Sequence, residues 1–590
     1  MSDHQNSGRE QGMEKYFFRA AAQDFQKIPT HPLAYWLNSA AINAFSGKPI
    51  GDVLTFKQGI ATSDNERFLR VWHEVSNSKK DIYCSSPSDL KKSNKKWFPY
   101  NKGGSFRKWF GNNEIVVNWE HDGFEMKQFT STLPQGTHVR LKSREYYCLP
   151  CITYSALSSG DFGCRISDSG YLFDTKGSCI FGSSQDLSIY SGFLNSKVAK
   201  TFLGVLCPTL DYSMVGIKQV PVLPGQRFDN VAIVNNCTAL SRSDWDSYET
   251  SWSFTSLPLL HPDYRQSTLK ASYQKLRAHW SEMTLEMQRL EQENNRIFID
   301  AYGLQDELDE KVDLSEITLT CNPHYRYGGD KSEEELETML LADTMRELVS
   351  YAVGCMFGRY SLDKPGLILA NQGETLADYL AQVAKPSFPA DDDNVIPLLD
   401  GDWFPDDITL RFRQFLRVAF GDAHYEDNLA FIEQALNVKG KRNYGLRDYF
   451  LGEFYADHVK RYKKRPIYWL FSSPKGTFSA LVYLHRYRPD TVSVVLNYLR
   501  DFRKKLASRL DYLQQVAINP SASQSEKTKA SKEADTIKKQ LIELDDYERD
   551  TLYPLATEQV ELDLDDGVKV NYLKLGKALK KIPGLEAKED

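Results

Sequence analysis

The residues at 321–325 are of the types, and at the spacing, that could bind a base. A short apolar run at 317–320 leads into Cys321, and Asn322, Pro323, His324 and Tyr325 follow. In such a loop the Asn side chain and the Pro carbonyl accept hydrogen bonds from an amino group, and the Tyr ring stacks on a base that has left its duplex. An ordinary turn between two elements is the competing interpretation, and the sequence favours it because His324 stands where a second Pro would stiffen the loop.

A basic and aromatic segment at 79–110 predicts a surface for a polyanion. It contains nine Lys or Arg residues and two acidic residues, although the whole chain has a net charge of −6. Its later basic residues are interleaved with Trp97, Phe98, Tyr100, Phe106, Trp109 and Phe110. Arg140, Lys142 and Arg144 follow in a second basic stretch. Localised positive charge on an otherwise acidic protein is typical of nucleic-acid binding. A solvated lysine-rich loop is the alternative.

Other chemistry has weaker support. Cys148 and Cys151 have the spacing of one zinc knuckle, but the next pair, Cys164 and Cys179, lies too far apart to repeat it, so buried thiols without a ligand are favoured. No His-x-His or His-Glu-x-x-His motif occurs, and no glycine-rich loop has the flanks of a phosphate-binding loop. We therefore expect no metal site and no catalytic residue on this chain.

Composition indicates a soluble, multidomain protein. The chain has 590 residues, and this length is too great for a single hydrophobic core. Of its residues 41% are hydrophobic and 26% are charged, as in ordinary globular proteins. No apolar run reaches the roughly 18 residues of a membrane span. Nine cysteines, an odd number, favour a reducing cytoplasm over a disulfide framework. Residues 1–15 have the composition of a disordered leader.

Two long helical patterns follow a strand-rich first part of the sequence. Short β-rich runs and turns dominate residues 17–256, with only a few helical segments, for example at 192–206. From position 269 apolar residues then recur with alternating spacings of four and three up to Ile297, with Asn294 at one core position of this heptad pattern. Near the C-terminus, stripes at 502–516 and 537–552 flank a Pro- and Ser-containing turn, which predicts an antiparallel helical hairpin. We expect the 269–297 stripe to pack on this hairpin.

The predicted fold class is an α/β target-recognition domain followed by long spacer helices and a mainly helical C-terminal region that ends in an antiparallel helical hairpin. The predicted domains are a disordered leader at 1–15, an α/β DNA target-recognition domain at 16–260, a long spacer helix at 261–312, a mainly helical domain at 313–470, and a C-terminal helical hairpin and tail at 471–590.

Several long stretches resemble one family, the PglX-type adenine-specific DNA methyltransferases of BREX phage-defence systems. The similar stretches run from about position 16 to 575, and they are similar to the C-terminal, target-recognition half of the family. They include KQGIATSDNERFLRVWHEV, KKWFPYNKGGSFRKWFGNNEIVVNWEHDG, GFLNSKVAKTFLGVLCPTLDYSMVGIKQVPVLP, YAVGCMFGRYSLDKPGLILAN and KRPIYWLFSSPKGTFSALVYLHRYRPDT.

The resemblance implies a division of labour. In the family, a catalytic half with a glycine-bearing cofactor loop and an Asn-Pro-Pro-Tyr loop precedes the region that this chain resembles. The stretch around Asn322 resembles a C-terminal segment of the family and not that catalytic loop. We therefore expect no cofactor on this chain. S-adenosylmethionine would be bound by a catalytic partner, which is either a separate subunit or the other half of a split protein.

The predicted function is sequence-specific recognition of double-stranded DNA for an adenine (N6) methyltransferase in phage defence, without catalysis by this chain alone. Its expected partners are DNA, a methyltransferase catalytic half or subunit, and other defence-system proteins, with no membrane. The predicted DNA-binding residues are Gly59, Thr62, Asn65, Arg67, Lys91, Lys92, Lys95, Lys96, Trp97, Tyr100, Lys102, Arg107, Lys108, Arg140, Lys142 and Arg144. Two alternatives remain open: a degenerate but active methyltransferase that uses Asn322, Pro323 and Tyr325, and a scaffold or decoy in the defence complex that does not bind DNA.

Overall fold

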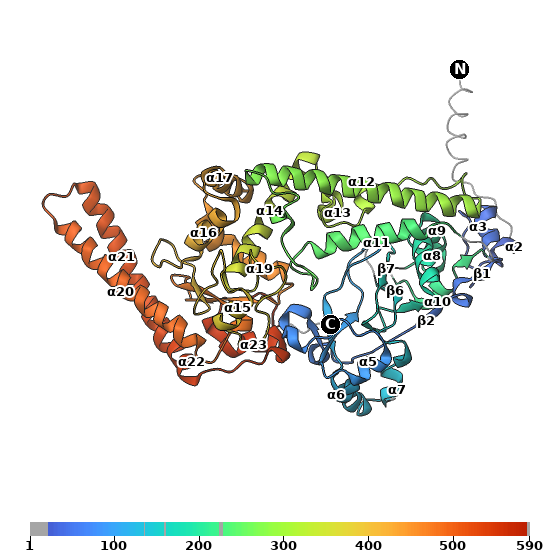
Figure 1. Cartoon of the computed structure of the whole chain (residues 1–590), viewed down its shortest axis with the longest axis horizontal. Coiled ribbons are helices and arrows are strands. Elements are labelled where there is room, and N and C mark those ends of the chain that lie inside the picture. Colours follow the sequence, from blue (N-terminus) through green and yellow to red (C-terminus); the bar gives the residue numbers. More distant parts are fainter. Residues whose placement is uncertain (1–21, 135, 158–160, 210, 224–227, 587–590) are drawn as a thin grey trace, which may run out of the picture. The chain divides into compact units, whose positions relative to one another are not determined.

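The computed structural model describes residues 22–134, 136–157, 161–209, 211–223 and 228–586. They form two compact units, each assembled from three separate parts of the chain. Unit 1 comprises 22–63, 81–245 and 280–328, and unit 2 comprises 64–80, 246–279 and 329–586. The protein is mixed α/β with a helical C-terminal region, and Figure 1 gives the order of its elements. The predicted leader at 1–15 lies outside the described residues.

Unit 1 contains short strands that form small sheets. The strands of unit 1 are β1 (Lys48–Pro49), β2 (Thr55–Lys57), β4 (Trp97–Asn101), β5 (Ile115–Asn118), β6 (Cys151–Tyr154), β7 (Cys164–Ser167), β8 (Leu172–Phe173), β9 (Cys179–Phe181) and β10 (Pro221–Val222). Strands β2, β9, β6 and β7 are neighbours in an antiparallel sheet in which Phe56 and Ile152 both pair with Ile180. In a second sheet, β4 lies between antiparallel β5 and parallel β8. Strand β1 pairs with β10.

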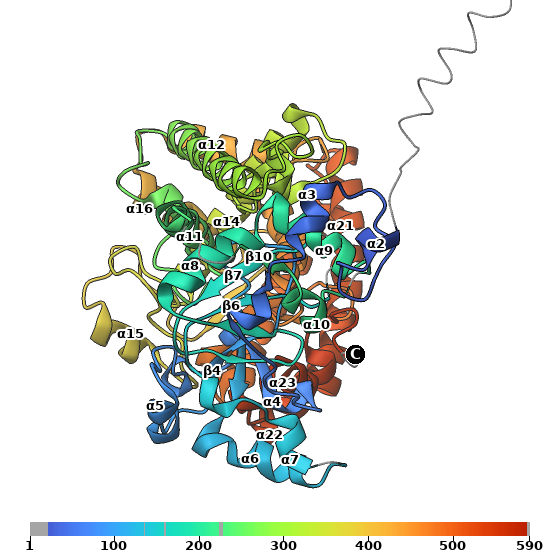
Figure 2. The same ribbon diagram turned by 90° about the vertical axis from the view of Figure 1, so that its right-hand side faces the viewer.

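Helices pack against the first of these sheets. The helices of unit 1 are α2 (Ala22–Phe25), α3 (Ser39–Ala44), α5 (Pro87–Lys92), α6 (Glu120–Ser131), α7 (Gly136–Arg140), α8 (Ser184–Leu194), α9 (Lys197–Leu206), α10 (Met214–Lys218), α11 (Val231–Asp246) and α13 (Pro323–Tyr327). Helix α8 lies beside β6 and β7 in both views (Figures 1 and 2). The core of this region combines Ile152, Ile180, Phe193 and Phe202 with Phe298 from a later helix.

The segment 192–206, which the sequence pattern predicts as one helical stretch, is divided between α8 and α9. Asn195 ends α8 because its side chain accepts a hydrogen bond from the Cys164 backbone and donates one back. Ser196 then caps α9 by accepting from Ala199 N at 3.3 Å. The break fixes both helices to the edge strand β7.

Helix α12 (Leu269–Tyr302) covers the predicted heptad stripe in full. Its first part, 269–279, belongs to unit 2 and its remainder to unit 1. Asn294 is buried, donates to Gly192 O at 2.9 Å and accepts from Asn230 at 3.4 Å. A Cβ on Gly192 would lie 2.2 Å from Asn230 Nδ2, so the close approach needs glycine. The polar residue in the stripe therefore positions this helix against α8 and α11.

Unit 2 is mainly helical around one small sheet. Its elements are α4 (Asn65–Phe68), β3 (Leu69–Val71), α14 (Glu333–Met356), α15 (Leu376–Gln382), β11 (Val395–Pro397), α16 (Ile408–Phe420), α17 (Tyr425–Leu436), α18 (Leu446–Tyr449), the π-helix η8 (Phe450–Phe454), α19 (Tyr455–Arg461), β12 (Tyr468–Ser472), β13 (Ser479–Tyr483), α20 (Thr491–Ile518), α21 (Gln524–Tyr547), α22 (Tyr553–Glu558) and α23 (Gly567–Leu575). Strand β13 lies between β11 and β12, all antiparallel.

Helices α20 and α21 lie side by side as the long pair at the red end of the colour bar in Figure 1. Two ion pairs show that the helices run in opposite directions. Arg509 pairs with Glu533 near the turn, and Arg503 pairs with Asp545 farther from it. Apolar residues such as Leu506 and Leu544 face the other helix of the pair, in a core shared with β12 and β13.

Two expectations concern the organisation of the chain. The predicted domains follow one another along the chain. The two units do not, because α12 is divided between them and residues 64–80 belong to unit 2 although they lie between two segments of unit 1. The packing of the 269–297 stripe on the hairpin stays a prediction, since positions 280–297 belong to unit 1 and the hairpin to unit 2. Within unit 2, Tyr273 of the stripe lies 6.4 Å from Phe431, between ring centroids. In the described part of the chain, no helix combines the length and apolar character needed to cross a membrane.

Candidate nucleic-acid interface

Helix α5 presents the first basic group of unit 1. Ser86 caps the helix by accepting from Asp89 N at 3.2 Å, Pro87 occupies its first turn and Leu90 anchors it in the core. Lys91 and Lys92 are exposed in the last turn, where the helix dipole stabilises positive charge. The sequence folds this way because only one face of the short helix is apolar.

The chain from α5 to β4 carries two further lysines. Lys95 and Lys96 are half-buried, and Lys96 Nζ lies 5.6 Å from the ring centroid of Trp97. Ser93 fixes the stretch by donating to Asp81 Oδ2 at 2.8 Å. Its path is thus set by hydrogen bonds and by the buried strand that follows.

A second basic group comes from the loop at 58–63 and the stretch at 140–146. Ile60 pairs with Leu141 as an antiparallel bridge, and Ala61 N donates to Arg140 O at 2.8 Å. Arg140 Nη1 donates to Ser63 Oγ at 2.9 Å. These contacts hold Arg140 beside an exposed serine.

Three more basic side chains lie near the same loop. Lys142 Nζ donates to Gln58 Oε1 at 3.3 Å, and Lys57 Nζ lies 4.6 Å from the ring centroid of Tyr146. Arg144, in the short 3-10 helix η5 (Arg144–Tyr146), is exposed. The loop therefore gathers cationic groups whose partners are neutral.

Buried residues support this loop from beneath. Ile60 N donates to Phe173 O at 2.8 Å, and Tyr100 donates to Asp174 Oδ2 at 2.9 Å. A Cβ on Gly59 would lie 1.9 Å from Phe173 O, so the strand and the loop approach each other as closely as glycine permits. The loop is a rigid part of the fold.

The two basic groups lie close together in unit 1. Helix α5 contacts η5, and Cys84, just before α5, lies with its Sγ 3.2 Å from that of Cys148, just after η5. Within the described part of the chain, five basic side chains of these groups have no carboxylate within 4.0 Å: Lys91, Lys92, Arg140, Lys142 and Arg144. We call these five residues the basic face. Its positive charge is available to an external anion.

Several residues predicted to bind DNA are buried instead. Thr62, Trp97, Tyr100, Arg107 and Lys108 are all less than 6% exposed. In this structure these five side chains offer little surface to DNA, and Gly59 contributes a close approach to Phe173. Charge and aromatic content were the sequence signal for Trp97, Tyr100, Arg107 and Lys108, and neither reveals burial.

Arg107 and Lys108 form internal ion pairs. Arg107 Nη1 lies 3.4 Å from Asp244 Oδ2. Lys108 Nζ donates to Glu291 Oε2, and Trp109 Nε1 donates to Glu291 Oε1 at 2.7 Å. Buried charges need such partners because the interior does not solvate them. The pairs fix the 107–109 segment to α11 and α12.

Other predicted residues lie elsewhere. Asn65 and Arg67 belong to α4 of unit 2, where Arg67 lies 5.2 Å from the Phe68 ring centroid. Lys102 is half-buried at the end of β4. Lys79, part of the basic segment, belongs to unit 2 and pairs with Asp565 at 2.7 Å. The long basic run is therefore divided between the two units.

The Asn322 loop is a turn that begins a short helix. Asn322 is fully buried, and its amide donates to Leu314 O at 2.7 Å and to Ile317 O at 2.8 Å. Its Oδ1 accepts from His324 N at 3.1 Å and so caps α13. Pro323 is buried and Tyr325 donates to Phe106 O. The Asn322 amide is therefore engaged in internal hydrogen bonds in this structure.

The nine cysteines are all buried thiols without disulfides. Cys151 and Cys179 lie in the neighbouring strands β6 and β9, where Asn101 Nδ2 is 3.9 Å from each sulfur. Burial raises the pKa of Cys151 well above its ordinary value. In the part of the chain that is described, no three His, Cys, Asp or Glu side chains are grouped as metal ligands would be.

Sequence reasoning missed four residues of the interface: Lys57, Gln58, Ser63 and Asp174. Three of them lie in the stretch KQGIATS around Gly59, so their closeness to the glycine in sequence was a usable signal. Asp174 had none, because its role depends on its contact with Tyr100, which lies 74 positions away in sequence.

The chain is similar to two adenine-specific methyltransferases. It is 36% identical over 577 residues to the adenine-specific methyltransferase BrxX of Escherichia coli O9:H4 (strain HS), which covers 95% of this chain and 46% of BrxX. It is 35% identical over 575 residues to the adenine-specific methyltransferase PglX of Lacticaseibacillus casei (strain Zhang), covering 95% and 45%. No protein-family model matches. The chain is therefore a homologue, over nearly all its length, of adenine-specific methyltransferases of the BrxX and PglX type, and it spans about half the length of these curated relatives.

Proposed function

We propose that unit 1 binds double-stranded DNA as the target-recognition part of a PglX-type adenine-specific DNA methyltransferase. The observation that carries the proposal is the basic face, whose five cationic side chains lack carboxylate partners and stand on a rigid, buried frame. The similarity to two adenine-specific methyltransferases supports it independently.

The basic face suggests two kinds of contact. Lys91, Lys92 and Arg144 are exposed and suited to phosphates, which fix the register of a protein on a duplex. Arg140 is half-buried and held by Ser63, and its guanidinium could form the paired hydrogen bonds by which arginine reads guanine. Lysines 95 and 96 would add further phosphate contacts.

We propose that the methyl donor is bound outside this chain. S-adenosylmethionine would lie on a catalytic half or subunit of the kind that the family resemblance implies, and the target adenine would turn out of the duplex into that partner's pocket. Titration calorimetry of the purified chain with S-adenosylmethionine should show no binding. A micromolar signal that disappears in Asn322→Ala would instead assign the methyl donor to the Asn322 turn.

Replacement of the first basic group tests DNA binding directly. The quadruple variant K91S/K92S/K95S/K96S should bind unrelated duplexes more weakly, because phosphate contacts carry no sequence information. Its matched control is K504S/K529S/K532S/K539S, which removes four exposed lysines from α20 and α21 of unit 2. If gel shifts show the same loss of DNA affinity in both variants, the loss follows from the change in net charge. That result would exclude the basic face as the binding site.

The proposal extends to partners in the cell. The resemblance to BREX methyltransferases implies work in the cytoplasm beside other phage-defence proteins. Mixing the chain with a PglX-type catalytic half should restore adenine methylation at one non-palindromic site. If both parts are folded, this chain binds DNA and the mixture stays inactive, then the division of labour is wrong and a scaffold or decoy role replaces it.

A further inference from the structure

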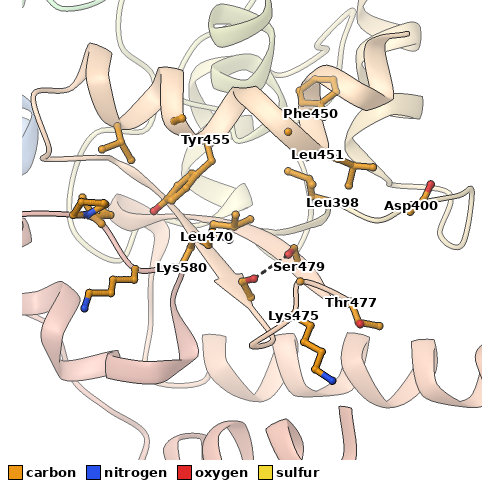
Figure 3. Close-up of a pocket in the computed structure, with 18 of the residues that line it drawn as sticks. Leu398, Asp400, Phe450, Leu451, Tyr455, Leu470, Lys475, Thr477, Ser479 and Lys580 are labelled. Carbon is orange, nitrogen blue, oxygen red and sulfur yellow. Dashed lines mark hydrogen bonds between the residues drawn. The ribbon is translucent and has the colours of Figure 1, made fainter. Parts of the chain in front are cut away.

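Unit 2 contains a large pocket that the proposed DNA-binding role does not use. It has a volume of about 880 Å³ and lies between η8 and α19 on one side and β12, β13 and the 580–583 segment on the other (Figure 3). Pockets of this size are typical of sites for small organic ligands. The π-helical turn at its wall is a feature that occurs often at functional sites.

The pocket is lined by an excess of positive charge. Five exposed lysines contribute to it, and they are Lys460, Lys464, Lys475, Lys580 and Lys581. Asp400 is the one acidic residue of the lining. Among the described residues, none of the five lysines has a carboxylate within 4.0 Å. A ligand with several negative charges would therefore find cationic partners that are not already used.

The opposite part of the lining is apolar and stiff. Phe450, Leu451 and Leu470 provide aliphatic and aromatic surface, and Leu451 is 44% exposed at the mouth. The Tyr455 hydroxyl lies 2.9 Å from that of Tyr572, which donates in turn to Lys580 O. This chain of hydrogen bonds fixes the Tyr455 ring, which Figure 3 shows between the helical wall and Lys580. An apolar or planar molecular body fits such a wall.

Hydroxyl groups stand between the two parts. Ser479 Oγ lies 3.4 Å from Ser472 Oγ across β12 and β13, as the dashed line in Figure 3 marks. Thr477 follows the tight turn at 473–476, in which Gly476 N donates to Ser473 O at 2.9 Å, and its own hydroxyl donates to the Glu543 carboxylate. The two serine hydroxyls are suited to the hydroxyls and ring edges of a polar ligand.

We propose that this pocket binds a nucleoside polyphosphate. Its phosphates would meet Lys475, Lys580 and Lys581, since lysine is a common point-charge partner of phosphate. Its base would lie against Tyr455 and Leu451, and the serine pair would contact its sugar. A fatty acid would leave most lysines unused, and inorganic polyphosphate would leave the apolar wall in water.

Titration calorimetry with ATP, ADP, adenosine and inorganic tripolyphosphate tests the proposal on the full chain. ATP should bind once per chain, and both adenosine and tripolyphosphate should bind at least about tenfold more weakly, because each lacks one class of contact. K475E/K580E should lose at least about tenfold in ATP affinity, the effect of reversing two charged contacts. The control K504E/K538E, which makes the same charge change on α20 and α21, should bind as the unaltered chain does.

Further variants separate the phosphates from the base. Leu451→Ser, at the exposed mouth, should weaken ATP binding but leave tripolyphosphate binding unchanged. ATP should also protect Lys475 and Lys580, but not Lys504, from acetylation in the unaltered chain, which requires no variant to fold. K91S/K92S/K95S/K96S should retain ATP binding, so the pocket can be tested whether or not DNA binding is found.

Several results would overturn the proposal. They are absence of binding at millimolar ATP, equal losses in K475E/K580E and the control, tripolyphosphate binding as tight as ATP binding, or decanoate binding tighter than ATP binding.

Discussion

Tyr100 donates a hydrogen bond to Asp174 at 2.9 Å from beneath the 59–62 loop, and its hydroxyl is also 3.3 Å from Ile60 O. Both side chains are buried, and burial together with the nearby carboxylate raises the pKa of Tyr100 well above its ordinary value, so the hydroxyl stays a donor. The loop that positions Arg140 thus depends on a residue that itself lies in the core.

Tyr100→Phe should therefore lower both stability and DNA affinity. Loss of the donor leaves the buried Asp174 carboxylate short of a partner, which costs about 1–3 kcal/mol in free energy of unfolding. Urea unfolding measures the first effect and fluorescence anisotropy with labelled duplex the second. The control Tyr83→Phe alters a side chain that is 86% exposed and should change neither quantity. Unchanged stability in Tyr100→Phe would show that the hydrogen bond does not support the loop.

Two glycines should respond to alanine with opposite signs. In Gly59→Ala the new Cβ would lie 1.9 Å from Phe173 O, so the loop must move, at a cost of about 1–3 kcal/mol. In Gly204→Ala the Cβ meets no atom within 4 Å on the exposed side of α9, and alanine should stabilise that helix by about 0.5–1 kcal/mol. Thermal unfolding of the two variants measures both. Equal melting temperatures would contradict the close approach at Gly59.

Lys108 should affect folding and not DNA contact. Lys108→Met leaves the Glu291 carboxylate buried without its cation, which costs about 3–5 kcal/mol. The double variant K108M/E291Q should be more stable than K108M alone, because the uncompensated charge is gone. Denaturant unfolding gives both free energies. Two results together would instead make Lys108 a DNA contact. Folded K108M would lose salt-dependent DNA affinity, and K108M/E291Q would be no more stable than K108M.

Three buried histidines of unit 2 should make stability depend on pH. Burial, with the nearby Arg359, lowers the pKa of His73, His458 and His485 well below 6.5. The unfolded chain binds these protons near pH 6.5 and the folded chain does not, so their contribution is complete above about pH 6.5 and falls below it, by up to about 1.4 kcal/mol per pH unit for each histidine. Asp391, whose pKa burial raises to about 7, titrates in the opposite sense.

Comparing the pH dependence of stability in the unaltered chain and in a His73 variant isolates the contribution of that histidine. His73→Gln keeps a donor for Arg465 O, which lies 3.0 Å from His73 Nε2, and removes the titrating group. Between pH 7 and 5.5 its urea midpoint should fall less steeply than that of the unaltered chain. Identical slopes would show that His73 is protonated in the folded protein.

The sequence predicted some elements well, for local reasons. The alternating spacing from Leu269 to Ile297 depends only on neighbours along one helix, and α12 covers it completely. The stripes near Leu506 and Leu544 likewise fall within α20 and α21. Strands β12 and β13 were not foreseen within a region assigned to helices, although IYWLFSS and FSALVYL are rich in aromatic and branched residues.

The candidate site was harder because burial is decided by distant partners. Arg107 and Lys108 look like surface cations until Asp244 and Glu291 are brought to them from 137 and 183 positions away. Lys91 and Arg144 carry the same local signal and remain exposed. The lysines of the unit 2 pocket come from separate stretches, so no sequence window showed them together.

The salt dependence of DNA binding tests the central claim most directly. Anisotropy titrations of the unaltered chain, K91S/K92S/K95S/K96S and K504S/K529S/K532S/K539S with one duplex, from low to physiological salt, give the slope of log affinity against log salt. Each phosphate that a lysine or arginine neutralises releases counterions and contributes about −0.9 to that slope. We predict a steep slope for the unaltered chain and the unit 2 control. For K91S/K92S/K95S/K96S we predict a shallower slope. The slope should change by about 0.9 for each phosphate that the replaced lysines neutralise in the unaltered chain. Affinity that does not change with salt, or one slope shared by all three proteins, would contradict the assignment of the basic face to DNA.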